Sequence, residues 1–395
     1  MPAIKSIHRS YVSTSRFFLL ISIRVLWVAV LGQDVKIGLY PDNQITSLVF
    51  SAVKDTYKIY TDTVCLSVIL PGEILYARLE DNKIRLLNKT IYPGLFSELE
   101  LRQQGKNGTF QLKPVSPVLN SADYEGDLIL VTENDYIQII NKIDIEKYVS
   151  AVIEAEGGSN APVEYYKAQA VLIRTYAIKN MFRHGAKNYN LCSTEHCQVY
   201  RGKSLLNSHI QEATYATRGM VLTDSGRKLV TAPYHANCGG QTGTSDIAWQ
   251  IKLPCLISVN DPFCVNKRNH SWTKKIPLKV WTGYLRSQGV NTNGLSVSDF
   301  VFRSPFRTKY YTVRSVSIPL RKIREDFNLK SSFFQIVNDD AGEVVIQGKG
   351  FGHGVGLCQD GAIEMARVGY TYVDIIHFYY QNVLITNIAR TETRQ

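Results

Sequence analysis

Residues 144–180 read DIEKYVSAVIEAEGGSNAPVEYYKAQAVLIRTYAIKN, and this stretch predicts two helices around a glycine break. The first helix is expected from about Asp144 to Glu156, because its apolar residues recur at the spacing of one buried helix face. Gly157 and Gly158 end that helix. Pro162 suits a first helical turn, so a second helix is expected to run from there to about Asn180. The pair forms the centre of the predicted fold.

Glu156 lies on the apolar face of the first helix. It follows Val152 by four residues and Val149 by seven, whereas Glu154 is turned by roughly 200° to the other side. A carboxyl group held against apolar surface has a raised pKa and can serve as a general acid. The alternative is a glutamate at a helix end that only points inward.

Two cations of the second helix, Lys167 and Arg174, are seven residues apart. That spacing places them nearly in register, about 10 Å apart along one helix face. They are therefore candidates for flanking an anionic or polar substrate. Two solvated charges on a surface helix would give the same pattern.

Four ordered blocks of sequence resemble one family. They are YVSAVIEAE with PVEYYKAQAVLIRTYA, then CQVYRG from Cys197, YHANCGGQT from Tyr234, and GHGVGLCQDGAIEMARVGYTYVDIIHFYY from Gly352. These blocks resemble the SpoIID/LytB family of stage II sporulation protein D and amidase enhancers. Because they keep the family's order over about 240 residues, the resemblance is specific.

The resemblance implies a lytic transglycosylase that cuts peptidoglycan strands stripped of their peptides. Glu156 occupies the family's catalytic position and would act as general acid and then base, without a second carboxylate. The residues expected to hold the sugar and its lactyl carboxylate are Lys167, Arg174, Tyr176, His235, His353 and Gln359. The rival function is a non-catalytic, wall-binding activator of an N-acetylmuramoyl-L-alanine amidase. A purely structural role for His353 also remains open.

A second group combines two thiols and two imidazoles within fourteen residues: His184, Cys192, His196 and Cys197. These ligand types suit a tetrahedral structural zinc. The resemblance points the same way, because some SpoIID proteins hold zinc with two cysteines and two histidines in this region. The alternative is a Cys192–Cys197 disulfide beside unrelated histidines. A zinc hydrolase is a further alternative, and it would need an open metal position.

Two other cysteines, Cys255 and Cys264, are nine residues apart around a turn and are expected to form a disulfide. This assignment leaves Cys65, Cys238 and Cys358 without a role. His235 and Cys238 also invite a cysteine-nucleophile interpretation. However, residues three apart on a glycine-rich loop have no fixed mutual geometry.

The N-terminus predicts an export signal. Residues 1–32 carry four cations and no acid, and they include a short apolar run from Phe17 to Leu31. We expect cleavage near Gly32 or Gln33, with an uncleaved membrane anchor as the alternative. The formal net charge of +11 falls to about +7 without this segment, which favours anionic polymers such as the cell wall. We do not expect nucleic acid as a partner, because the chain is expected to be exported and has no basic run interleaved with aromatic residues.

The whole pattern predicts an α+β protein of two parts. Residues 33–143 carry short apolar runs broken by turn residues and are expected to be β-rich, with a looser insertion over about 88–121. That insertion could be a recognition loop or a plain connector. Residues 144–395 are expected to form the catalytic domain, its cleft lying between the two helices, the His235 loop and the His353 segment.

Near the C-terminus, alternate glycines in GKGFGHGVG from Gly348 predict an extended segment that packs tightly beneath the cleft. A helix from Gln359 to Arg367 is expected to follow it. A further helix is expected around Leu278 to Ser287.

Overall fold

The computed structural model describes residues 34–87, 94–158, 160–204, 207–249, 251–338 and 342–388. The expected export signal at residues 1–32 lies outside the described residues. Within them, no helix is both long and apolar enough to cross a membrane. Helices and sheets are mixed along the chain, so the predicted α+β class is confirmed.

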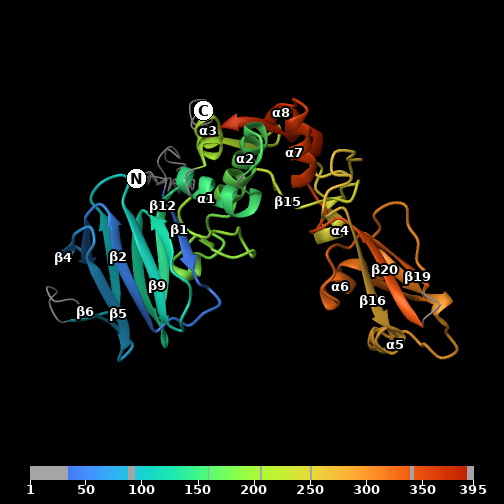
Figure 1. The fold of residues 1–395 in the computed structure, drawn as a ribbon, viewed down its shortest axis with the longest axis horizontal. Helices are drawn as coiled ribbons and strands as arrows, with labels where there is room; N and C mark the ends of the chain where they lie inside the picture. Colours follow the sequence, from blue (N-terminus) through green and yellow to red (C-terminus); the bar gives the residue numbers. More distant parts are fainter. Residues whose placement is uncertain are drawn as a thin grey trace, which may run out of the picture.

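The N-terminal part is a pair of β-sheets that share one hydrophobic core (Figure 1). The first sheet has the order β13 (Leu191–Cys192), β1 (Asp34–Leu39), β12 (Tyr136–Asp144), β11 (Asp127–Glu133), β8 (Glu98–Gln103), β3 (Tyr57–Thr61) and β4 (Val64–Ile69). The second has the order β10 (Ala122–Glu125), β9 (Thr109–Ser116), β2 (Ser47–Lys54), β5 (Ile74–Glu80), β6 (Lys83–Leu87) and β7 (Leu95–Phe96). Alternate residues face inward, as Leu48, Phe50 and Ala52 of β2 do.

The prediction of a looser insertion over residues 88–121 is wrong for residues 94–121, the part of it that the structure describes. Strand β8 lies inside the first sheet between β11 and β3, and β9 lies inside the second between β10 and β2. Both strands pair with partners that are distant in sequence, for example Phe50 with Leu112. The turn residues between them mark a connection between sheets.

Helix α1 (Ile145–Gly157) follows β12 without a linker, as the sequence predicts. The Asp144 side chain caps it by accepting the backbone N–H groups of Glu146 and Lys147 at 2.9 and 3.3 Å. Gly158 follows the helix with a φ of +75°, a conformation that L side chains rarely adopt. Glu156 is therefore fixed in the last turn of a helix whose start and end are both defined.

Helix α2 (Val163–Lys179) is buried on most sides, because elements from both halves of the chain pack around it. Its partners are α1, α3 (Ser208–Ala216), β14 (Met220–Thr223), α7 (Gln359–Arg367) and α8 (Tyr372–Tyr379). Figure 1 shows the red C-terminal helices beside the green α2. Strand β22 (Leu384–Asn387) then pairs antiparallel with β14.

A second hydrophobic core lies between residues 271 and 349. It contains a sheet of β16 (Ser271–Pro277), β20 (Glu343–Lys349) and β19 (Phe334–Asn338), with α5 (Leu278–Ser287) and α6 (Leu320–Asp326) against it. A hairpin of β17 (Tyr310–Val313) and β18 (Val316–Pro319) completes it. Figure 1 shows this unit at the opposite end of the molecule from the paired sheets.

The glycine-rich segment brings the chain back to the centre. β21 (Leu357–Cys358) pairs in parallel with β15 (Tyr234–His235), so that His235 lies opposite Cys358. Gly356 has a φ of +71°, and a Cβ there would meet the Pro233 carbonyl oxygen at 2.1 Å. This close approach requires glycine, which agrees with the predicted tight packing. A short helix, α4 (Ser245–Trp249), follows the β15 loop.

Candidate active site

Both carboxyl oxygens of Glu156 have partners from other segments of the chain. Oε1 accepts the backbone N–H of Val199 at 2.6 Å, and Oε2 accepts the hydroxyl of Tyr234. The Glu156 backbone carbonyl accepts the side-chain amide of Gln359 at 3.2 Å. A loop residue, a residue of β15 and the first residue of α7 therefore hold Glu156 in one orientation.

The pKa of Glu156 is raised above the ordinary value for a glutamate. Burial is the largest cause, because it penalises the charged carboxylate, and the charge of Glu195 adds to it. The hydrogen bonds from Tyr234 and Val199 act in the opposite direction without cancelling the effect. Glu156 can therefore keep its proton to a higher pH than an exposed glutamate, as a general acid requires.

A cavity of about 570 Å³ opens beside Glu156. Its lining includes two cations, Lys179 and Arg183, and two ring side chains, Trp249 and His353. The rings of Trp249 and His353 lie 5.2 Å apart. The site thus combines a proton donor with cations and two rings tilted by 51° to each other, a composition that suits a polar ring compound with an anionic group.

Tyr234 belongs to a chain of hydrogen bonds that leads away from Glu156. The side-chain amide of Gln198 donates to the Tyr234 oxygen at 3.4 Å and accepts the Tyr148 hydroxyl at 3.1 Å. Burial, as the largest cause, raises the pKa of Tyr234 well above its usual value. Tyr234 therefore remains a neutral donor toward Glu156.

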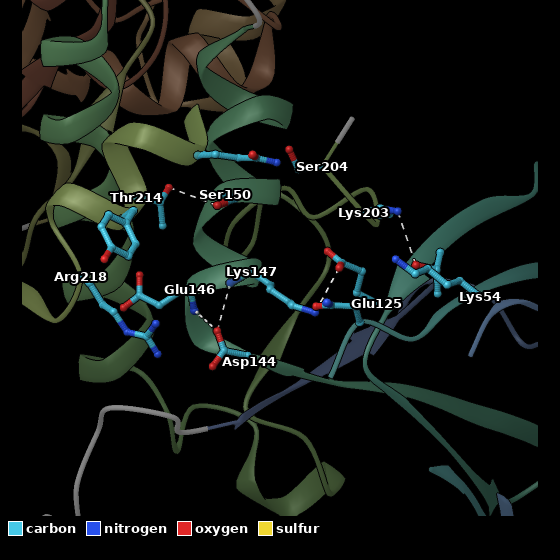
Figure 2. Close-up of a pocket in the computed structure, with 14 residues that line it drawn as sticks. Lys54, Glu125, Asp144, Glu146, Lys147, Ser150, Lys203, Ser204, Thr214 and Arg218 are labelled. Carbon is cyan, nitrogen blue, oxygen red and sulfur yellow. Dashed lines mark hydrogen bonds and ion pairs between the residues drawn. The ribbon is translucent and has the colours of Figure 1, made fainter. Parts of the chain in front are cut away.

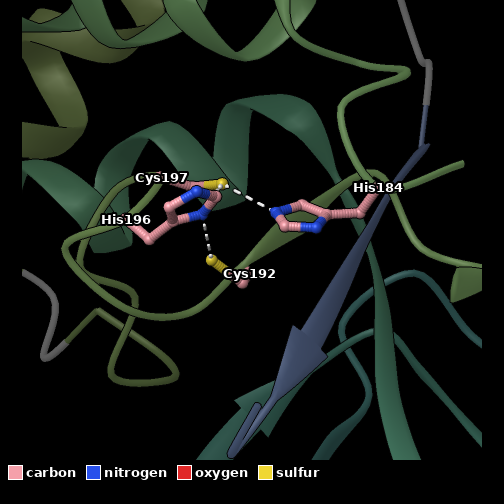
Figure 3. A group of neighbouring side chains, drawn as sticks. All are labelled: His184, Cys192, His196 and Cys197. Carbon is pink, nitrogen blue, oxygen red and sulfur yellow. Dashed lines mark hydrogen bonds between the residues drawn. The ribbon is translucent and has the colours of Figure 1, made fainter. Parts of the chain in front are cut away.

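The predicted metal ligands come together in the structure. Figure 3 shows His184, Cys192, His196 and Cys197 around one point, and their ligand atoms all lie within 4.8 Å of one another. His184 Nε2 is 3.3 Å from Cys197 Sγ, and His196 Nδ1 is 3.5 Å from Cys192 Sγ. Both cysteines are free thiols, so the alternative disulfide is not formed. Two sulfurs and two imidazole nitrogens at this separation fit a tetrahedral zinc.

The loop that carries these ligands also reaches the Glu156 cavity. Glu195, His196 and Cys197 line that cavity, and Val199 of the same loop hydrogen-bonds Glu156. An ion bound by the four residues would fix the loop that orients the carboxyl group. Its role there would be structural, because all four tetrahedral positions would be occupied by protein atoms.

Comparison of the sequence with those of known proteins assigns the chain to a family. The family model for SpoIID, Stage II sporulation protein, matches residues 133–223. An uncharacterized protein of Brachyspira hyodysenteriae is 32% identical over 278 residues, which are 69% of this chain and 74% of that protein. Stage II sporulation protein D of Bacillus amyloliquefaciens is 28% identical over 348 residues, or 82% and 93% of the two chains. The chain belongs to the SpoIID/LytB family.

The amidase enhancer of Bacillus subtilis is a further relative of this SpoIID/LytB protein. It is 26% identical over 294 residues, which are 60% of this chain and 40% of the enhancer. The family model covers β12, α1, α2, β13, α3 and β14 with their connections. That range includes Glu156 and all four residues of the Cys/His group.

Two residues expected to bind substrate in this SpoIID/LytB protein do not reach the cavity. The Arg174 guanidinium is fully buried, pairs with the Glu146 carboxylate at 2.5 and 3.0 Å, and donates to the Met220 carbonyl. Lys167 pairs with Glu164 at 2.6 Å. Neither lines the cavity, so both predictions are corrected to structural contacts. Helical spacing could not show that Arg174 is covered by neighbouring elements, because α2 is buried on most sides.

Tyr176 and His353 line the cavity, and their contact with a sugar stays a prediction. His235 does not line it and packs behind His353, with the ring centroids 5.4 Å apart. Burial lowers the pKa of His353 to about 4 and that of His235 well below its usual value, so both rings are neutral near pH 7. Gln359 contacts the Glu156 backbone and is a positioning residue.

Several residues that line the cavity were not predicted from the sequence, namely Lys179, Arg183, Gln198, Tyr234 and Trp249. Tyr234 stands directly before His235 in the YHANCGGQT stretch. Its importance comes from the pairing of β15 with β21, which joins residues more than one hundred positions apart. Trp249 is the last residue of α4, and no pattern in the surrounding SDIAWQIKL sequence marks it as a site residue.

The expected Cys255–Cys264 disulfide is absent, and both cysteines are free. Asp261 accepts the backbone N–H groups of Phe263 and Cys264 at 2.9 and 3.3 Å, which turns the chain sharply before Cys264. The Cys264 sulfur then lies 3.3 Å from that of Cys238. Short sequence separation favoured Cys255, but the turn directs Cys264 to another loop.

A second cavity, of about 470 Å³, lies at the opposite end of α1 from Glu156 (Figure 2). Some of its charged side chains have partners: Lys147 pairs with Glu125 at 3.1 Å, and Glu146 pairs with Arg174. Asp144 in its wall is the α1 cap. These contacts join α1 to the N-terminal sheets and to α2, and we assign this cavity a structural role.

Proposed function

We propose that this protein is an exported lytic transglycosylase that cuts the bond between N-acetylmuramic acid and N-acetylglucosamine in peptide-stripped glycan strands. The observation that carries this proposal is Glu156, a carboxyl group of raised pKa held between two donors at the wall of a polar cavity. Membership of the SpoIID/LytB family supports a role at the cell wall, and the basic charge favours an anionic polymer.

The chemistry requires one carboxyl group in two successive roles. Protonated Glu156 gives its proton to the glycosidic oxygen while the bond from that oxygen to the muramic acid C1 breaks. The resulting carboxylate takes the proton of the muramoyl 6-hydroxyl, whose oxygen forms a new bond to C1. Proton and bonds balance without water, and the product is an anhydro sugar.

The neighbours of Glu156 suit both steps. Burial favours the protonated acid before the reaction, while Val199 and Tyr234 donate to the carboxylate that exists between the two proton transfers. Lys179 and Arg183 would face the lactyl carboxylate, in place of the two cations expected from the sequence. Trp249 and His353 would stack against a sugar ring.

Glu195 allows an alternative mechanism, in which two carboxylates of the site take part in the reaction. Among the described residues it is the other carboxylate that lines the cavity, and a second carboxylate could activate water or attack C1. The decisive experiment is incubation of the full exported protein with peptide-stripped glycan strands and mass analysis of the products. We expect anhydro ends, lighter than reducing ends by one water, from the parent and from Glu195→Gln. Reducing ends that disappear in Glu195→Gln would establish hydrolysis with two carboxylates.

A second candidate function is activation of a cell-wall amidase without catalysis. The similarity to a protein named amidase enhancer is the observation in its favour. In that case the purified chain leaves stripped strands uncut but stimulates peptide removal by an added amidase. Measuring both activities on the same preparation separates the two functions.

Tyr234→Phe is expected to move the pH profile of cleavage. The hydroxyl of Tyr234 lowers the Glu156 pKa, so its loss raises that pKa further. Because the general acid must be protonated, activity falls as pH rises through this pKa, and the alkaline limb of kcat/KM should move to higher pH. The plateau should fall about tenfold, as for one hydrogen bond to a charged group. An alkaline limb that stays in place would show that Tyr234 does not act on Glu156.

We also propose that the Cys/His group binds one structural zinc ion. Cys192→Ser is expected to lose one equivalent of zinc and to unfold at lower denaturant concentration, because a closed site contributes folding energy. Elemental analysis of protein purified without added metal measures the first effect, and chemical denaturation measures the second. Unchanged zinc content in Cys192→Ser would contradict this assignment.

A further inference from the structure

Three thiols and one carboxylate from separate segments meet in the interior, away from the Cys/His group. Cys238 follows β15, Asp261 and Cys264 belong to the loop before β16, and Cys358 ends β21. Their ligand atoms all lie within 4.8 Å of one another. The three cysteines are fully buried and Asp261 is 1% exposed. We refer to these four residues as the Cys3Asp cluster.

The contacts inside the cluster orient every sulfur and the carboxylate toward the same point. Cys238 Sγ is 3.3 Å from Cys264 Sγ and 3.2 Å from Asp261 Oδ2. The backbone N–H of Cys238 donates to Cys358 Sγ, and that of Gly240 donates to Cys264 Sγ, both at 3.2 Å. Backbone donors of this kind stabilise thiolates, which are the form that binds metal.

A second layer of residues fixes the carboxylate. The Tyr379 hydroxyl donates to Asp261 Oδ2 at 2.9 Å, while Oδ1 accepts two backbone N–H groups of its own turn. Gly361 leaves the necessary room, because a Cβ there would lie 2.4 Å from Asp261 Oδ2. Metal ligands in proteins are commonly held by such outer hydrogen bonds.

The buried negative charge that the cluster carries when its thiols and carboxyl group are ionised requires a cation to balance it. A carboxylate and three thiols, all buried, either take up protons or share a positive ion. Arg307 lies nearby and donates to the Cys238 carbonyl at 2.6 Å, but its buried Nη1 has no hydrogen-bond partner. A divalent ion with three thiolates and one carboxylate would carry a net charge of minus two, which the Arg307 guanidinium would partly neutralise.

We propose that Cys238, Asp261, Cys264 and Cys358 form a second zinc site, structural in function. Three soft sulfurs and one oxygen suit tetrahedral zinc, and four protein ligands leave no open position for catalysis. A Cys238–Cys264 disulfide is the rival assignment in an oxidising compartment, but it would use only two of the four converging groups. The proposal stands independently of the function proposed above.

The position of this site suggests what the ion would stabilise. Cys358 immediately precedes Gln359, which contacts the Glu156 backbone, and Cys238 follows the strand that carries Tyr234. The ion would therefore tie together two segments that orient Glu156 and anchor them to the loop before β16. Its loss should loosen these segments while leaving the Cys/His group intact.

The test measures zinc per chain in the full exported protein, purified without reductant or added metal. We expect two equivalents in the parent, one in Cys264→Ser, one in Cys192→Ser and none in the double variant. Asp261→Asn is a milder second variant that keeps the shape and should release one zinc at a lower chelator concentration than the parent does. If Cys264→Ser keeps as much zinc as the parent, the proposal is wrong.

Labelling of the parent alone keeps the test decisive if the variants fail to fold. Unfolding in a chelator without reductant should make Cys238, Cys264 and Cys358 all reactive toward a thiol reagent. Peptide mapping that finds Cys238 joined to Cys264 would establish the disulfide and remove the second site. A parent whose single zinc equivalent is kept in Cys264→Ser and lost in Cys192→Ser would also contradict the second site.

Discussion

Glu156→Gln is expected to reduce cleavage of stripped glycan strands by at least about a hundredfold, the usual loss when a general acid is removed. Glutamine keeps the shape of the side chain: its amide oxygen can still accept the Val199 N–H, while its amide nitrogen can donate to the Tyr234 oxygen in place of the bond that Glu156 accepts. It cannot deliver a proton to the glycosidic oxygen or take one from the 6-hydroxyl. Folding and strand binding should persist, so the loss should appear in kcat while KM changes little.

Glu154→Gln is the matched control, because it removes a carboxylate two residues away on the same helix. Its carboxylate accepts the Ser204 hydroxyl at 2.5 Å and does not line the Glu156 cavity. Cleavage by this variant should remain close to that of the parent. Full activity in Glu156→Gln, or a parent that never cuts stripped strands, would favour the amidase activator.

Those features of the site that depend on local sequence could be predicted. The period of α1 placed Glu156 on the buried face, and its pKa is raised mainly by burial as expected. The Cys/His group was recognisable because its four ligands lie within fourteen residues, a span short enough for one loop to bring them together. Helix α7 was predicted with its observed bounds, Gln359 to Arg367, from its alanine-rich pattern after the glycines.

Features that depend on distant pairing could not be predicted in this way. Tyr234 reaches Glu156 only because β15 pairs with β21, and Cys264 meets Cys238 only because Asp261 turns its loop. Neither contact leaves a periodic or spacing signal near the residues concerned. The strands within residues 94–121 were missed for the same reason, since their partners lie more than fifty residues away in β2 or after the segment in β11.

Arg174 shows how a correct local pattern can lead to a wrong function. Its place on α2 is compatible with substrate binding, but its partner Glu146 comes from the first turn of α1, 28 residues earlier. The guanidinium has no exposed surface, and the Glu146 carboxylate is only 13% exposed. A cation in this position joins α1, α2 and the β14 strand and is unavailable to a glycan.

Arg174→Met is therefore expected to lower the free energy of unfolding by about 3 kcal/mol, since it leaves Glu146 as an uncompensated, largely buried charge. Lys167→Met on the same helix breaks a partly exposed pair and should cost less than about 1 kcal/mol. Chemical denaturation of both variants measures the difference. Adding Glu146→Gln to Arg174→Met should recover part of the loss, because the stranded charge is then removed. If Arg174→Met is as stable as the parent but binds glycan weakly, Arg174 binds substrate and its structural role is wrong.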